Sequence, residues 1–229
     1  MAGLMGAQLV GTAATHRRVH GTAVAIGLAL GVFSVLADGV LRWRALTTLG
    51  NIISPWVVVA FVAGRVARSP RAGGWAGLQA LAVGVVSYYV LQGLRFTSGD
   101  APYSLLHATH LVWLVAAVVV GPAVGAAGGA SARLRPPMLA VVGPAAILTA
   151  EAMYLVMDRQ PWRWNLSKEP HRLADIGVFL ALLGLALSLP ALLTEDRGRR
   201  RRAYGALAIC ATAGAIGIRL LYRTITAVA

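Results

Sequence analysis

Long apolar runs separated by short polar connections dominate the chain. Seven runs are long enough, or nearly so, to cross about 30 Å of hydrocarbon, which takes roughly 20 helical residues. In lipid each backbone N–H and C=O must be paired within its own segment, so the runs are expected to be α-helices. The sequence therefore predicts an all-α, polytopic transmembrane helical bundle. Its predicted spans are residues 19–38, 49–66, 75–94, 105–127, 138–157, 173–193 and 204–222.

The last of these runs leaves the number of spans open. Arg219 and Arg223 shorten the apolar part of residues 204–222, so six spans are the alternative to seven. The connections between the runs are short, which leaves no room for a soluble domain. We therefore expect residues 1–229 to form one transmembrane domain.

Composition supports a lipid environment. Of the 229 residues 58% are hydrophobic and 13% are charged, whereas soluble proteins average about 25% charged residues. The net charge of +13 does not indicate nucleic-acid binding, because the arginines lie in short clusters between the apolar runs. The single cysteine, Cys210, excludes an internal disulfide and any site with several cysteine ligands. No cofactor is indicated, and the lipid bilayer is the one partner that composition predicts.

Basic residues indicate the orientation of the bundle. With a cytoplasmic N-terminus, twelve basic residues fall on the inner side and nine on the outer side, as the positive-inside rule favours. This orientation makes residues 1–18 a cytoplasmic segment, 158–172 an extracytoplasmic loop and 194–203 an arginine-rich cytoplasmic loop. One lysine among 21 basic residues suggests a GC-rich bacterial genome. We therefore expect a multi-pass protein of a bacterial plasma membrane, with an uncleaved first helix.

Glycines repeat every four residues in "GPAVGAAGG". Gly121, Gly125 and Gly129 therefore share one helix face. Small residues at this spacing let helix backbones approach each other closely in lipid. The stripe can serve contact with a partner subunit, and packing inside the same bundle is the simpler explanation.

Polar side chains within the spans gather toward the predicted outer side. Tyr88 and Arg95 lie on one stripe of the third span, and Glu151 and Tyr154 lie on one stripe of the fifth. The cytoplasmic halves of the spans are almost purely apolar. We therefore predict an outward-facing polar pocket. Its candidate ligand-binding residues are Asn51, Trp56, Tyr88, Arg95, His107, His110, Glu151 and Tyr154.

Glu151 is the most informative of these residues. A charged carboxylate at the bilayer centre costs about 2.5–3.5 kcal/mol on insertion scales, unless it takes up a proton or is paired. Arg95, His107 and His110 are the candidate partners. Glu151 can belong to a ligand site, or it can simply link two helices. The two histidines and Glu151 match no metal-binding motif, so no metal site is expected.

Three functions remain open at this stage. The first is a non-enzymatic protein that binds a small molecule, such as the capture subunit of a transporter. The second is an intramembrane enzyme that acts on a lipid or isoprenoid, with Glu151 as the general acid. The third is a structural or assembly protein without a ligand. The motifs of ATPases, zinc proteases, serine hydrolases and metal-dependent prenyl transferases are absent from the sequence.

One family resemblance begins at "NIISPWVVVAFVAGRVARSP". This stretch, Asn51 to Pro70, resembles an uncharacterised family of actinobacterial integral membrane proteins, known only as a domain of unknown function. The likeness continues through "GLQALAVGVVSYY", "VVVGPAVGAAGG" and the glutamate of "LTAEAMY", over roughly residues 20–190. It implies a polytopic membrane fold and no particular activity. The seventh span and the run Arg197 to Arg202 are expected to lie outside the common part of that family.

A second likeness is one of architecture alone. The substrate-capturing membrane subunits of vitamin importers are also small, outward-opening helical proteins. Their first helix uses small residues spaced by four, as Ala25 and Ala29 are here. Such an analogy concerns the fold and carries no residue roles.

Overall fold

The described part of the chain is entirely helical. The computed structural model describes residues 2–39, 44–50, 52–96, 108–159 and 172–228. Within these ranges there are eight helices: α1 (Ala2–Gly39), α2 (Arg44–Gly50), α3 (Ser54–Ala67), α4 (Pro70–Phe96), α5 (Ala108–Ser131), α6 (Met138–Arg159), α7 (Leu173–Leu193) and α8 (Arg197–Val228). The predicted all-α class is confirmed.

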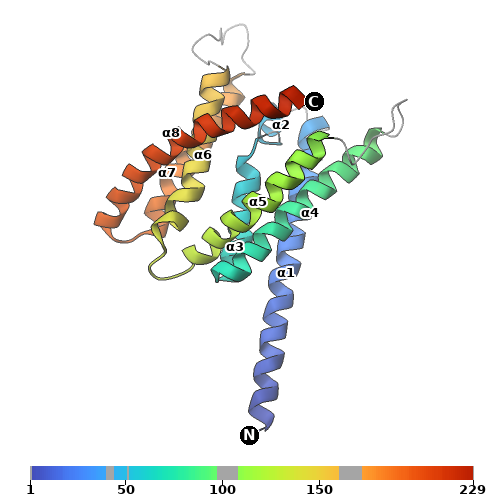
Figure 1. Ribbon diagram of the computed structural model, residues 1–229, viewed down its shortest axis with the longest axis vertical. Helices are drawn as coiled ribbons and strands as arrows, with labels where there is room; N and C mark the ends of the chain where they lie inside the picture. The colour runs from blue at the N-terminus through green and yellow to red at the C-terminus, as the bar shows by residue number, and fades with distance from the viewer. Residues whose placement is uncertain (1, 40–43, 51, 97–107, 160–171, 229) are drawn as a thin grey trace.

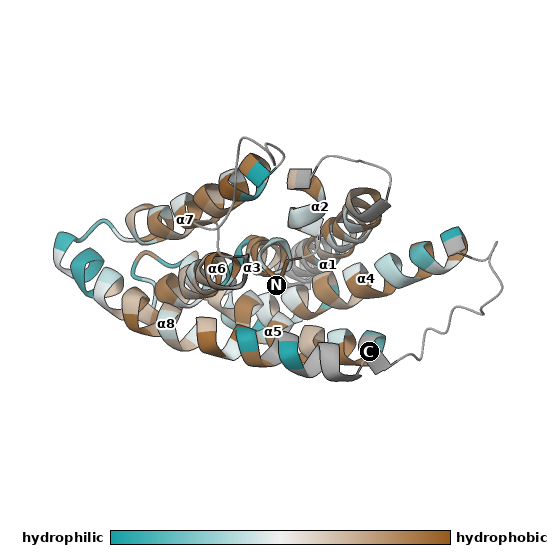
Figure 2. Cartoon of the chain, turned by 90° about the horizontal axis from the view of Figure 1, so that it is seen from above, coloured by the Kyte–Doolittle hydropathy of each residue, from teal (hydrophilic) through white to brown (hydrophobic). Residues whose placement is uncertain are grey.

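Six of the described helices are long and apolar enough to cross a membrane. The candidate spans are Arg17–Ala37, Pro70–Arg95, His110–Ser131, Met138–Met157, Leu173–Leu193 and Arg197–Leu220. Figure 1 shows successive long helices running in alternating directions, with the N-terminus at one end of the bundle and the C-terminus at the other. Hydrophobic residues cover most of the helix surfaces in Figure 2. The chain is therefore a multi-pass membrane protein.

The second predicted span is not one helix. The sequence predicted a span at residues 49–66, but α2 ends at Gly50 and α3 begins at Ser54. At about 1.5 Å per residue, the 14 residues of α3 extend roughly 21 Å, less than the thickness of the hydrocarbon. Pro55 explains why the helix does not continue, because proline lacks an N–H and is favoured in the first turn of a helix.

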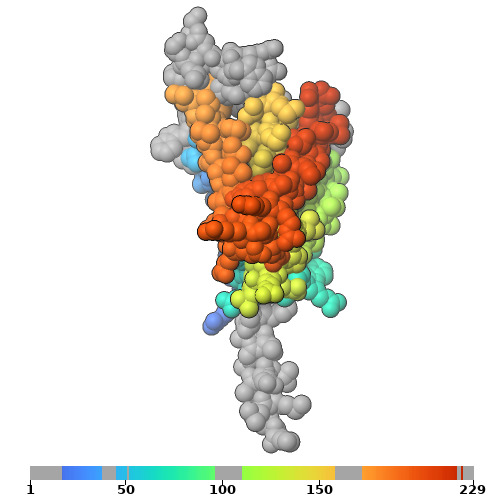
Figure 3. Space-filling view, turned by 90° about the vertical axis from the view of Figure 1, so that its left-hand side faces the viewer, coloured from blue at the N-terminus to red at the C-terminus, as the bar shows by residue number. Residues whose placement is uncertain are grey.

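The arginine-rich segment near the C-terminus is helical. Residues 194–203 were predicted to form a loop, but α8 begins at Arg197 and the connection from α7 needs only three residues. Arginine is a good helix former, and the Asp196 carboxylate accepts a hydrogen bond from the Gly198 N–H at 2.7 Å. Figure 3 shows α8 passing diagonally in front of α6 and α7. The segment predicted at 204–222 thus belongs to a longer helix that can cross the membrane.

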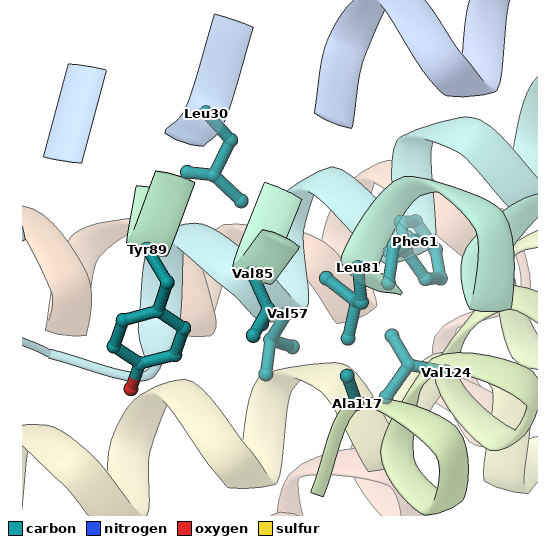
Figure 4. Packing of buried hydrophobic residues seen from close by; sticks show 9 residues of the cluster. Leu30, Val57, Phe61, Leu81, Val85, Tyr89, Ala117 and Val124 are labelled. Atoms are coloured by element: carbon teal, nitrogen blue, oxygen red, sulfur yellow. The ribbon is translucent and has the colours of Figure 1, made fainter. Parts of the chain in front are cut away.

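The N-terminal half of the bundle is held by a continuous apolar core. Side chains of α1, α3, α4 and α5 meet there, and Figure 4 shows them extending from Tyr89 to Val124, with Leu30 of α1 above them. A second cluster joins α6 to α7 through Leu148, Val178 and Leu182. The buried residues of α7 lie on one helical stripe, and the rest of that helix is largely exposed. The helix α7 is therefore attached along one side only.

Glycines bring the backbones of α3, α4 and α5 into direct contact. A Cβ atom on Gly125 would lie 2.8 Å from the Cα of Gly77 and would also strike the carbonyl oxygen of Gly73. A Cβ atom on Gly121 would lie 2.9 Å from the Cα of Leu78, and one on Gly129 would strike the carbonyl oxygen of Ser69. The stripe Gly121, Gly125 and Gly129 therefore packs inside the bundle. It is not available to a partner subunit, because helices of the same chain already cover it.

Candidate functional site

The first turn of α3 lies inside the bundle and is capped by Glu151 from α6. The Ile53 N–H donates to Glu151 Oε1 at 2.6 Å, and the Ser54 N–H donates to Oε2 at 2.5 Å. The Ser54 hydroxyl also donates to Oε2. Glu151 has no exposed surface, and Ser54 has none either. Both carboxylate oxygens are therefore engaged by the start of a helix that lies 97 residues earlier in the chain.

This arrangement explains why a carboxylate is tolerated in an apolar span. The first N–H groups of any helix lack partners within that helix, and in lipid an unpaired N–H costs several kcal/mol. Ile53, at the N-cap position, makes no side-chain capping bond of its own. Glu151 supplies the missing acceptors, and its carboxyl oxygens face the positive end of the α3 dipole.

The pairing expected from the sequence is therefore revised. Arg95, His107 and His110 were the candidate partners of Glu151, but within the described residues its partners are Ile53 and Ser54. Arg95 is exposed in the last turn of α4. The backbone of α3 replaces a charged side chain as the counterpart of Glu151, because the break after α2 leaves N–H groups that need an acceptor. Asn51 and His107, two other predicted site residues, lie outside the described residues.

Tyr88 and His110 belong to one polar and aromatic cluster at the junction of α4 and α5. The rings of Tyr89 and His110 lie 3.8 Å apart between centroids, and those of Tyr88 and Tyr89 meet edge to face at 5.0 Å. The Gln92 side-chain amide donates to the Tyr88 hydroxyl at 3.2 Å. We call Tyr88, Tyr89, Gln92 and His110 the outer cluster.

Gln92 carries an unused hydrogen-bond acceptor within this cluster. The residue is only 8% exposed, and its Oε1 has no hydrogen-bond partner among the described residues. A buried amide oxygen normally accepts at least one hydrogen bond. Within the described residues, this oxygen can therefore still accept a hydrogen bond from a water molecule or a ligand.

Trp56 and Tyr154 pack against apolar residues of the bundle. Trp56 is partly buried against the apolar core of α1, α3, α4 and α5. A Cβ atom on Gly84 would lie 3.0 Å from its ring. Tyr154 packs against Ala150 of α6 and two residues of α8, beside Ile53. Ile53 also packs against the core that contains Tyr89, so it lies between the Glu151 cap and the outer cluster.

Other polar residues at the same end of the bundle were not predicted as site residues. The Thr48 hydroxyl of α2 donates to the buried Asp175 carboxylate of α7 at 2.6 Å, which ties α2 to α7. Tyr89 was also missed, because it lies off the helical stripe that Tyr88 shares with Arg95. Ser54 could have been found from the Ser-Pro pair, which is typical of a helix start. Among the described residues, no three His, Cys, Asp or Glu side chains gather closely enough to hold a metal ion.

Comparison with known proteins identifies the family of the chain but assigns it no activity. No similar chain is found among the curated proteins or the solved structures. One family model matches residues 11–227, a range that includes nearly all of α8. The expectation that the last span lies outside the common part of the family is therefore wrong. The chain belongs to a family of unknown function (DUF6518).

Proposed function

We propose that the chain binds a small polar molecule at the outer cluster and does not transform it. It would do so in a bacterial plasma membrane, with the N-terminus in the cytoplasm and the outer cluster near the exterior. The capture subunit of a transporter acts in this way. The observation that carries the proposal is the buried, unpartnered Oε1 of Gln92 beside the rings of Tyr88, Tyr89 and His110.

The chemistry of the outer cluster supports a ligand with both a flat face and a hydrogen-bond donor. Aromatic rings offer surfaces for stacking, and the amide oxygen offers an acceptor. Binding sites in membrane transporters are often built next to discontinuous helices, and the break between α2 and α3 is such a feature.

Glu151 has a positioning role in this proposal. Both its oxygens are occupied by Ile53 and Ser54, and its surface is fully covered. A general acid must come within hydrogen-bond reach of the reacting group. The described geometry therefore favours a binding protein over an enzyme in which Glu151 donates a proton. By fixing the start of α3, Glu151 also fixes Ile53 against the core that contains Tyr89.

Labelling of an introduced cysteine tests whether the outer cluster is reached by water from the exterior. In a Cys210→Ser background, Gln92→Cys is expected to react with a membrane-impermeant maleimide added to intact cells. The reaction requires a thiolate, which forms only where water has access. The labelled fraction is measured by the mass shift of the purified chain.

Two control positions on α4 make the result specific. Val86→Cys lies one to two turns away on an exposed apolar surface, where lipid should prevent labelling. Arg71→Cys lies at the opposite end of α4 and should react only after the cells are opened. If Gln92→Cys stays unlabelled while both controls behave as stated, the outer cluster is closed core and the proposed function is wrong.

A further inference from the structure

A lateral groove lies between α3, α6 and α7, at the end of the bundle opposite to the outer cluster. Its volume is about 390 Å³, and except for Arg65 its lining is apolar. Val57, Phe61 and Val62 come from α3, Leu148 from α6, and Leu185 from α7. Leu185 and Val62 are each about two-fifths exposed. In a bilayer this groove opens directly to lipid, because α7 is attached to the bundle along one side only.

A second cavity adjoins the groove at the end where Arg65 lies. It has a volume of about 700 Å³ and lies between the α5–α6 connection, the α7–α8 corner and the end of α3. Figure 3 shows the yellow-green α5–α6 connection directly below the orange α7–α8 corner. Arg65, Leu192 and Leu193 line both spaces. The two cavities therefore meet at these three residues.

The second cavity is basic, and its arginines pair with no carboxylate of the described residues. Its lining includes Arg65, Arg133, Arg135 and Arg199, and none of the four forms an ion pair within the described part of the chain. Arg65 donates to Ser131 at 2.9 Å, and Arg199 donates to the Pro136 carbonyl at 2.6 Å. These bonds hold both guanidinium groups at the mouth of the cavity and leave further donors available on each.

The acidic residues nearby do not neutralise this charge. Glu195 and Asp196 also line the cavity, which leaves the four arginines in excess by two charges. The Asp196 carboxylate is already engaged by the Gly198 N–H at the start of α8. An anionic group with several oxygen acceptors, such as a phosphate diester, fits the charge and the remaining donors.

We propose that an anionic phospholipid binds here. Its phosphate lies among Arg65, Arg133, Arg135 and Arg199, and one acyl chain lies in the groove between α3 and α7. From Arg65 to Val57 the groove follows α3 over eight residues, about 12 Å, which is the length of a substantial part of an acyl chain. An apolar groove that begins at a basic cavity matches a molecule with an apolar tail and an anionic head. With the predicted orientation, this lipid belongs to the cytoplasmic leaflet, where anionic lipids attract basic segments.

Native mass spectrometry of the delipidated full-length chain tests the proposal. The chain is titrated with palmitoyl-oleoyl phosphatidylglycerol, with phosphatidylcholine of the same acyl chains, and with inorganic phosphate. One phosphatidylglycerol is expected to bind more tightly than phosphatidylcholine, and inorganic phosphate should not displace it. If both lipids bind equally, or if phosphate displaces the lipid, the two-part site is wrong.

Matched variants separate this site from general charge and from loss of folding. Arg133→Gln/Arg135→Gln, on an exposed connection, should weaken phosphatidylglycerol binding about fivefold per arginine removed. Arg201→Gln removes an exposed arginine that does not line the cavity, and it should leave binding unchanged. An equal loss in Arg201→Gln would show that total charge, and no defined site, attracts the lipid.

The groove is tested with substitutions of the same type on two faces of α7. Leu185→Trp fills the groove and should weaken phosphatidylglycerol binding, while Leu180→Trp, on an exposed face outside the groove, should not. The melting temperature of each variant is measured alongside, and binding is compared only between variants that melt like the parent chain. Unchanged binding in a folded Leu185→Trp variant would overturn the assignment of the acyl chain.

Discussion

Replacing Glu151 with alanine is expected to destabilise the fold by about 3–5 kcal/mol, because three buried donors lose their acceptor together. The loss leaves the Ile53 N–H, the Ser54 N–H and the Ser54 hydroxyl without their acceptor in a site that has no exposed surface. Each unsatisfied buried donor costs about 1–3 kcal/mol. The measurement is reversible unfolding of the purified chain in mixed micelles, followed by circular dichroism.

A graded series makes this prediction specific to the cap. Ser54→Ala removes one of the three donors and should cost only about 1 kcal/mol. Glu151→Gln keeps one acceptor oxygen but turns an NH₂ group toward N–H donors, so its effect should lie between the other two. A Glu151→Gln variant as stable as the parent chain would show that the carboxylate is not needed to cap α3.

Replacing Gly125 with alanine is expected to damage the contact of α4 with α5 strongly. The added Cβ would meet the Gly73 carbonyl oxygen, and it would lie 2.8 Å from the Gly77 Cα and 3.0 Å from the Gly77 nitrogen. All three are backbone atoms and cannot rotate away, so the two helices must separate. Overpacking of this kind costs about 1–3 kcal/mol. The melting temperature of the purified chain should fall accordingly.

Glycines with open surroundings provide the matched controls. A Cβ atom on Gly177 or on Gly184 of α7 would meet nothing within 4 Å. Alanine at these helical positions should be neutral or should stabilise by about 0.5–1 kcal/mol, because alanine is the better helix former. If Gly125→Ala melts like these controls, the close approach of α4 and α5 is not a feature of the protein in its membrane.

The long helices could be predicted because their signal is local. Spans predicted at 138–157 and 173–193 agree with α6 and α7 almost to the residue. Apolar composition over about 20 residues is enough to identify such a helix. The prediction of one continuous span at 49–66 was wrong, because composition does not reveal where a helix is interrupted. The break before Ser54 depends on Pro55 and on an acceptor that a distant helix supplies.

The sequence was enough to predict several residues of the candidate site. It was not enough to predict which of these residues contact each other. Glu151 was identified because a carboxylate in an apolar span needs a partner, and that reasoning holds. Its partner was sought among side chains, although the sequence offers backbone N–H groups wherever a helix starts. Tyr88 and His110 do lie in one cluster, but the contact depends on how α4 crosses α5. That crossing is set by Gly77, Gly121 and Gly125, whose effect is visible only in three dimensions.

The distance along the chain between Ser54 and Glu151 also constrains biosynthesis. A ribosome must complete α4, α5 and most of α6 before the acceptor for the start of α3 exists. Until then α3, with 14 residues, is too short to cross the bilayer by itself. We therefore expect α3 to take its final depth in the membrane only after α6 has been made.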